Sequence, residues 1–110
     1  MRLQISNNVA EGPGIRISGH YPILDARLVG DRVFVIYDYM EFDKGAPARN
    51  LFCYDRSGAE LWRAADIGSG SSDAYTNVLS ETPLWVNNFS SFRCRIDERT
   101  GAVLETEFTK

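Results

Sequence analysis

Histidine and cysteine, the residues used most often for acid–base and metal chemistry, are scarce in this sequence. The chain has one histidine, His20, and two cysteines, Cys53 and Cys94. One histidine cannot form a histidine-rich metal site, and two distant cysteines are too few for a four-ligand zinc site or a disulfide scaffold. We therefore expect no metal and no cofactor, an exposed His20 without a catalytic role, and two buried free thiols.

Long apolar runs and excess positive charge are also missing. The longest apolar run, residues 33–37, is much too short to cross a bilayer, and residues 1–6 lack the apolar segment of a signal peptide. The formal net charge is −3, from 15 acidic and 12 basic residues, so the chain has no excess of positive charge that would attract the polyanionic backbone of nucleic acids. These features predict a cytoplasmic protein that binds neither membranes nor nucleic acids, and for which a basic partner is more suitable than an acidic one.

The sequence does contain an ordinary globular composition and repeated alternation of apolar and polar residues. Its 110 residues are 44% hydrophobic and 25% charged, which fits a single folded domain over residues 1–110. The alternating segments are rich in β-branched and aromatic residues and end at Gly, Pro, Asn or Asp, as strands do. The expected strands are residues 3–5, 15–17, 23–29, 32–39, 50–55, 59–63, 84–89, 92–97 and 102–108.

One helical turn is expected at residues 74–79, capped by Ser72 or Asp73. The segment before it, residues 66–73, has oxygen-bearing side chains and glycines but no EF-hand pattern, so we expect a solvated, flexible loop. The prediction is an all-β domain, an antiparallel β-sandwich or flattened barrel of about eight or nine strands arranged in two sheets.

A hairpin pattern occurs twice. Residues 51–61 align with residues 92–104, which matches Cys53 with Cys94 and, with small insertions, an Asp and a Gly-Ala pair in each copy. Facing residues of an antiparallel hairpin share one face of the sheet, so apolar and charged side chains test the register. In the second copy the expected facing pairs are Phe92 with Phe108, Ile96 with Leu104, Arg93 with Glu107, and Arg95 with Glu105. In the first copy they are Cys53 with Trp62 and Leu51 with Ala64.

The first copy resembles the repeat of PQQ-type β-propellers, in which an aromatic strand, an Asp, a turn Gly and a Leu-Trp pair recur. Here these are Phe52 to Asp55, Gly58 and Leu61-Trp62, whereas the second copy has Leu104-Glu105 in place of Leu-Trp. The likeness covers roughly residues 20–110 as two blades. Two blades cannot close a propeller, and no quinone-binding residues of the family can be placed on this chain. The resemblance therefore implies blade-like hairpins but no quinone cofactor.

A cluster of aromatic and acidic residues follows the first hairpin, whose tip is Gly30-Asp31. The loop over residues 40–49 is longer than a hairpin needs, and Met40 is a large apolar residue within it. Aromatic groups surrounded by acidic ones suit a basic protein surface, because charge speeds association and buried aromatic rings supply affinity. The candidate protein-binding residues are Tyr37, Asp38, Tyr39, Glu41, Phe42 and Asp43. The alternative is that these carboxylates are only the solvent face of strands and turns.

We expect a protein-binding domain that is not an enzyme. Small acidic β domains of this size are similar in form to contact-dependent growth inhibition immunity proteins, which implies an inhibitor that occludes a basic toxin such as a nuclease. A second hypothesis is a small β-barrel that binds a hydrophobic ligand in a pocket between two sheets. Its lining would be Phe34, Ile36, Trp62, Trp85 and Phe89. A third is a repeat unit of a larger propeller assembly.

Overall fold

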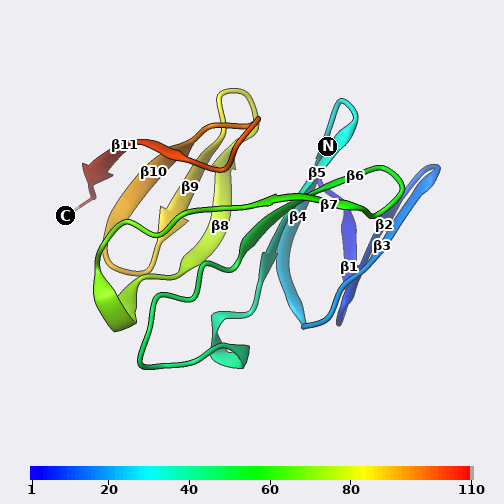
Figure 1. The fold of residues 1–110 in the computed structure, drawn as a ribbon. Helices are drawn as coiled ribbons and strands as arrows, with labels where there is room; N and C mark the ends of the chain where they lie inside the picture. The colour runs from blue at the N-terminus through cyan, green and yellow to red at the C-terminus, as the bar shows by residue number, and fades with distance from the viewer. Residues whose placement is uncertain (110) are drawn as a thin grey trace.

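The fold consists of three antiparallel sheets built from eleven strands (Figure 1). The structure is a computed structural model that describes residues 1–109. The N-terminal sheet contains β1 (Gln4–Ser6), β2 (Val9–Gly12) and β3 (Ile15–Ser18). The central sheet contains β4 (Ile23–Val29), β5 (Arg32–Tyr37), β6 (Leu51–Asp55) and β7 (Glu60–Arg63). The C-terminal sheet contains β8 (Tyr75–Ser80), β9 (Trp85–Asn88), β10 (Phe92–Ile96) and β11 (Val103–Phe108).

Helix is limited to two single 3₁₀ turns, η1 (Tyr39–Glu41) and η2 (Gly70–Ser72). No helix within residues 1–109 is long and apolar enough to cross a membrane. The predicted all-β sandwich class is therefore confirmed. The strand number and the two-sheet arrangement differ from expectation, because β2 and β8 are additional strands and the N-terminal residues form a sheet of their own.

The helical turn expected at residues 74–79 is wrong, because this segment is strand β8. Two register shifts occur along its pairing with β9, one between Tyr75 and Asn77 and one between Val78 and Ser80. Each bulge adds a residue, so the buried side chains Tyr75 and Val78 lie three positions apart. That spacing imitates a helical period and hides the alternation of the strand.

The central sheet is buried on both faces. One face, with Phe34, Ile36 and Cys53, packs against the C-terminal sheet, and the other, with Val33 and Val35, packs against the N-terminal sheet (Figure 1). A strand covered on both faces has no need of polar alternation. This position explains why the longest apolar run of the sequence lies in β5.

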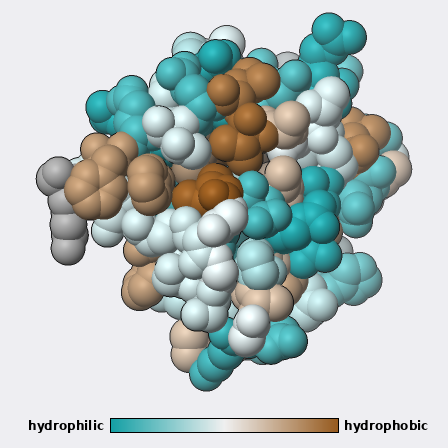
Figure 2. All heavy atoms as spheres, turned by 60° about the vertical axis from the view of Figure 1, so that its left-hand side comes forward, coloured by the Kyte–Doolittle hydropathy of each residue, from teal (hydrophilic) through white to brown (hydrophobic). Residues whose placement is uncertain are grey.

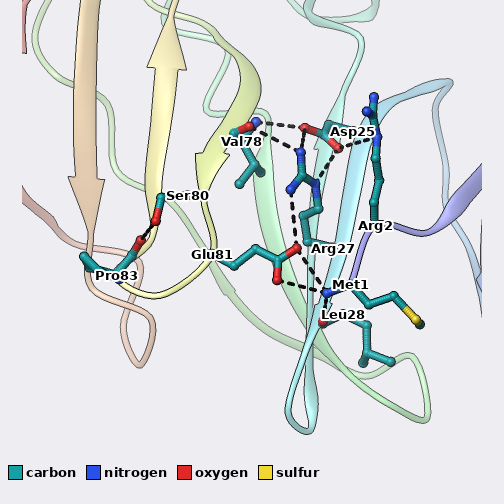
Figure 3. A network of polar contacts seen from close by, with 9 residues as sticks. All are labelled: Met1, Arg2, Asp25, Arg27, Leu28, Val78, Ser80, Glu81 and Pro83. Carbon is teal, nitrogen blue, oxygen red and sulfur yellow. Dashed lines mark hydrogen bonds and ion pairs between the residues drawn. The ribbon is translucent and has the colours of Figure 1, made fainter.

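The three sheets meet where β4 contacts both β1 and β8. Asp25 of β4 is 2% exposed and accepts hydrogen bonds from the backbone N–H of Val78 in β8 (2.8 Å) and from Nε of Arg27 (3.1 Å) (Figure 3). Arg27 also lies 3.3 Å from the Glu81 carboxylate beyond β8. A set of paired charges, in which Asp25 is buried and Arg27 and Glu81 are partly exposed, thus joins the central sheet to the C-terminal sheet.

Both predicted hairpins have the expected register. Phe92 faces Phe108, Arg93 faces Glu107, and Arg95 faces Glu105 in β10–β11, and Cys53 faces Trp62 in β6–β7. One pair differs: Ile96 faces Val103, because a bulge between Arg95 and Ile96 leaves Leu104 outside the ladder and 48% exposed.

The two hairpin turns share one construction. The Asp55 carboxylate accepts the backbone N–H groups of Ser57 and Ala59, and the Asp97 carboxylate accepts that of Arg99. Gly58 and Gly101 then take positive φ values of 93° and 79°, which a side chain would resist. Each hairpin provides the third and fourth strands of a four-stranded sheet.

Cys53 and Cys94 are free and buried, as the sequence predicted, and the structure places both in the same core. Burial raises the pKa of each thiol to about 11. An unfolded chain loses these protons near pH 9, while the folded chain keeps them, so increasing pH favours unfolding. The stabilisation is complete below about pH 9 and is lost as the pH rises to about 11, by up to about 1.4 kcal/mol per pH unit for each thiol.

We therefore expect the urea unfolding midpoint to fall steeply between about pH 9 and pH 11. A double variant, Cys53→Ala with Cys94→Ala, should be less stable at neutral pH. It should still show a shallower fall, because burial also raises the pKa of Tyr54 and Tyr75. Equal slopes for the two proteins would contradict this assignment.

Candidate functional site

The six residues nominated by the sequence do not form one surface. Tyr37 is 1% exposed, and its hydroxyl is hydrogen-bonded to that of Tyr54 at 2.6 Å. Its nomination as a contact residue is wrong, because β5 is covered on the face where Tyr37 lies. Phe42 is half-buried and packs on Tyr21, with 4.7 Å between ring centroids. Tyr39 and Asp43 instead line a hollow, as does Met40 between them.

This hollow, here called the loop groove, has a volume of about 220 Å³. Three segments that are distant in the sequence form it: the loop after β5, the η2 region, and the turn between β9 and β10. All three lie at the lower end of the molecule in Figure 1. The lining residues are Tyr39, Met40, Asp43, Lys44, Ala46, Ala48, Ser71, Ser72, Ala74 and Phe89.

Two large apolar side chains flank the loop groove and remain open to solvent. Met40 is 56% exposed and Phe89 is 60% exposed. The Phe89 ring packs on Tyr39, with 5.6 Å between centroids. Large exposed apolar groups beside a hollow are typical of a contact site.

Backbone hydrogen bonds hold the three segments of the groove together. The N–H of Ala48 donates to the carbonyl of Asp73 (2.9 Å), and the N–H of Phe89 donates to the carbonyl of Ala74 (2.7 Å). The residues before β8 therefore connect the loop after β5 on one side with the β9–β10 turn on the other.

The fully buried Asn50 side chain stabilises this arrangement through hydrogen bonds to two of the strands. Its amide nitrogen donates to the carbonyls of Tyr37 and Tyr75, each at 2.7 Å, and its amide oxygen accepts the N–H of Tyr75 at 2.8 Å. One side chain thereby joins the end of β5 to the start of β8. Every donor and acceptor used is buried, so these bonds specify a single geometry.

Asp73 anchors the η2 region in the same way. Its carboxylate is buried and accepts the N–H groups of Ile67 (2.8 Å) and Ser69 (3.1 Å) and the side-chain amide of Asn88 (2.9 Å). The expectation of a solvated, flexible loop at residues 66–73 is therefore wrong at Asp73, which points inward. The sequence did not nominate Asn50 or Asn88, and it indicated Asp73 only as a candidate helix cap. In the sequence, Asn50 and Asn88 are recognisable only as polar residues beside the apolar positions of an expected strand.

Acidic residues dominate the rim near η1. Asp38 accepts the N–H of Met40 (2.9 Å) as the cap of η1, and Asp43 accepts the N–H of Gly45 (2.8 Å). Glu41 is exposed, and Lys44 is the one cation among the lining residues. Two of the three carboxylates thus hold the loop in shape as well as giving it negative charge.

The other candidate residues lie elsewhere. His20 is exposed. Phe34, Ile36 and Trp62 are packed core residues, Trp85 is half-buried in β9, and Phe89 is exposed, so these five do not enclose the shared ligand pocket that was expected. Within residues 1–109 there is no group of three or more His, Cys, Asp or Glu side chains that could hold a metal ion. The loop groove has apolar and acidic groups suited to contact.

Comparison with known proteins adds a family but no described activity. No curated protein and no solved structure matches the chain. One family model, described as "Domain of unknown function (DUF7957)", matches residues 3–108. This range contains all eleven strands as well as every segment of the loop groove. The chain belongs to the DUF7957 family.

Proposed function

We propose that this domain binds a basic protein partner through the loop groove. The observation that carries the proposal is the pair of exposed apolar side chains, Met40 and Phe89, that flank the hollow. The backbone segments around the hollow are held in place by hydrogen bonds from the buried side chains of Asn50 and Asp73. Interfaces gain most of their affinity from a few large apolar groups that become buried at the centre of the contact. A site that is already ordered before binding loses less conformational entropy when the partner arrives.

The size of the hollow favours a protein side chain over a free ligand. Pockets for drug-sized molecules usually have volumes of about 300–1,000 Å³. The loop groove has about 220 Å³ and is open on one side, which suits the insertion of one large side chain from a partner. Of the two binding hypotheses, the geometry therefore supports the protein partner better than the hydrophobic ligand.

The charge at the rim indicates the kind of partner. Asp43 lines the groove, and Asp38 and Glu41 lie on the adjacent η1 turn, so a basic surface would be attracted to this side of the groove and oriented by it. The specific form of this proposal is an immunity-type inhibitor that occludes a basic toxin, such as a nuclease. The small size of the domain and its net charge of −3 support that form.

A unit of a larger propeller has less support. The two four-stranded sheets with equivalent hairpins favour it, but the outer face of the C-terminal sheet has the ion pairs Arg93–Glu107 (2.8 Å) and Arg95–Glu105 (2.6 Å). A blade within a closed ring would pack this face against another sheet, whereas exposed ion pairs suit a face in contact with water.

Charge substitution at the rim tests the proposal. The partner is first isolated by affinity capture from the native host and then purified. Asp38→Asn and Asp43→Asn, which keep an oxygen acceptor for the Met40 and Gly45 N–H groups, combined with Glu41→Lys, should weaken binding at low salt by about 10- to 100-fold, mainly through slower association. The dissociation constant and the association rate are measured at two salt concentrations.

The matched control has the same change of charge on residues outside the groove: Asp31→Asn with Glu11→Lys and Glu60→Gln, all exposed. Its affinity should stay within about threefold of the unmodified protein. An equal loss of affinity in both variants would show that only the net charge of the domain matters. If neither variant lost affinity, the acidic residues Asp38, Glu41 and Asp43 would not be part of the interface.

A further inference from the structure

Strand β11 forms the outer edge of the C-terminal sheet, and this edge is uncovered in residues 1–109. β11 pairs only with β10 among the described strands. It is also highly exposed, with Leu104 at 48% and Phe108 at 62% exposed. An exposed edge strand presents unpaired N–H and C=O groups that can pair with another chain.

Four of the other five sheet edges have neighbours. The end of β7 is covered by the β10–β11 turn, since the N–H of Ala65 donates to the carbonyl of Gly101 and a Cβ at Gly101 would lie 2.6 Å from the Trp62 ring. β3 pairs only with β2 among the described strands, and its Ile17 side chain lies near Gly58 in the β6–β7 turn. Strands β1, β4 and β8 lie against one another. β11 has no such cover from the described part of the chain.

Hydrogen-bond alternation identifies the backbone groups that face outward. The N–H of Thr109 donates to the carbonyl of Ser91 at 2.9 Å, so residue 109 points toward β10. The N–H of Ile96 donates to the carbonyl of Leu84, so even-numbered residues of β10 point toward β9. In an antiparallel ladder the bonded positions alternate, which places Glu105 and Glu107 toward β10. The N–H and C=O groups of Thr106 and Phe108 therefore point away from the sheet.

The two faces beside this edge have opposite character. On the inner face, the Phe108 ring packs on Phe92 with 5.4 Å between centroids, and Val103 is half-buried. Figure 2 shows a band of apolar residues on the side of the molecule that carries the C-terminal sheet. On the outer face, Glu105 and Glu107 lie at the open edge, and each is paired on its other side with an arginine of β10, Arg95 and Arg93.

Charge decides between a second copy and a different chain. Pairing β11 with β11 of another molecule in an antiparallel register centred on residues 105–107 places Glu105 opposite Glu107, or one of the two glutamates opposite its own copy. Like charges that face directly across strands are destabilising. A strand with basic residues at these positions is attracted instead, and its alternate apolar residues can cover Phe108 and Val103.

We propose that β11 accepts an extended segment of a partner protein as a fifth strand of the C-terminal sheet, a segment that alternates basic and apolar residues. Backbone hydrogen bonds to Thr106 and Phe108 hold the added strand, and the two faces select its side chains. This surface is separate from the lining of the loop groove, so the inference does not depend on binding at that groove.

The probe is an eight-residue peptide of alternating lysine and valine, added to the full chain labelled with ¹⁵N. Amide hydrogen exchange should slow about tenfold or more at Thr106 and Phe108, and should change little at Glu105 and Glu107, which already bond to β10. A peptide of alternating lysine and serine has the same charge without the apolar face and should give no protection. Protection elsewhere, or equal protection by both peptides, would overturn the proposal.

Thr106→Pro removes the outward N–H without removing a bond to β10, and should abolish peptide binding. Thr106→Val keeps that N–H and should bind the peptide as the unmodified protein does. Phe108→Ser, at a position already exposed, provides a second variant whose fold is not at risk and should weaken binding about tenfold. Unchanged binding in Thr106→Pro or Phe108→Ser would refute the edge site. Protection of Thr106 that grows with protein concentration alone would also refute it, in favour of a second copy.

Discussion

Replacing Asn50 with leucine should destabilise the domain by about 3 kcal/mol or more. Leucine has a similar size, but it leaves the carbonyls of Tyr37 and Tyr75 and the N–H of Tyr75 without the bonds that Asn50 provides. Each buried polar group left without a partner costs about 1–3 kcal/mol. The free energy of unfolding is measured by urea denaturation at neutral pH.

The control is Asn87→Leu, the same chemical change at a half-buried position whose amide bonds only the Asn77 side chain, at 3.2 Å. It should cost less than about 1 kcal/mol. Amide exchange gives a second readout, because loss of Asn50 should speed exchange at Ala48 and Phe89 in the groove. If Asn50→Leu costs no more than Asn87→Leu, the groove does not depend on this network.

Arg27→Met should destabilise the domain by about 3–5 kcal/mol, because it leaves the buried Asp25 carboxylate without its nearest cation. Asp25 is 2% exposed, and Arg27 Nε lies 3.1 Å from its Oδ1 (Figure 3). The bond from the Val78 N–H to Asp25 joins the central and C-terminal sheets, so an uncompensated charge there weakens their junction. Urea denaturation again gives the free energy of unfolding.

A double variant separates charge from packing. Asp25→Asn combined with Arg27→Met removes both charges, and the new amide oxygen can still accept the Val78 N–H, so most of the lost stability should return. The exposed ion pair Arg93–Glu107 provides the matched control, and Arg93→Met should cost no more than about 1 kcal/mol. Equal losses for Arg27→Met and Arg93→Met would show that the junction does not depend on this pair.

The sequence predicted the elements in which local pattern and tertiary environment agree. In β10–β11, apolar residues alternate with opposite charges, and three of the four expected facing pairs occur. The fourth expected pair, Ile96 with Leu104, does not occur, because a bulge pairs Ile96 with Val103 instead. Bulges also concealed β8, since the extra residues placed Tyr75 and Val78 three positions apart. Local sequence does not encode where a bulge will relieve sheet curvature.

The candidate site was predicted in part. The loop after β5 was correctly singled out, because its length, Met40 and its carboxylates are visible in the sequence. The contribution of Phe89 was not visible, since contact with Tyr39 requires the β9–β10 turn to fold back beside η1. Tyr37 was misplaced although it ends the continuous apolar run of β5, which is the pattern of a strand covered on both faces.

Removing the apolar groups of the loop groove tests the account most directly. Met40→Ser with Phe89→Ser should weaken binding of the captured partner by about 100-fold, mainly through faster dissociation. Leu61→Ser with Leu79→Ser removes two exposed apolar side chains outside the groove lining, at 45% and 47% exposure, and should change affinity by less than about threefold. A loss in the first variant alone is the predicted result. Unchanged affinity after removal of Met40 and Phe89 would contradict the assignment of the loop groove as the binding site.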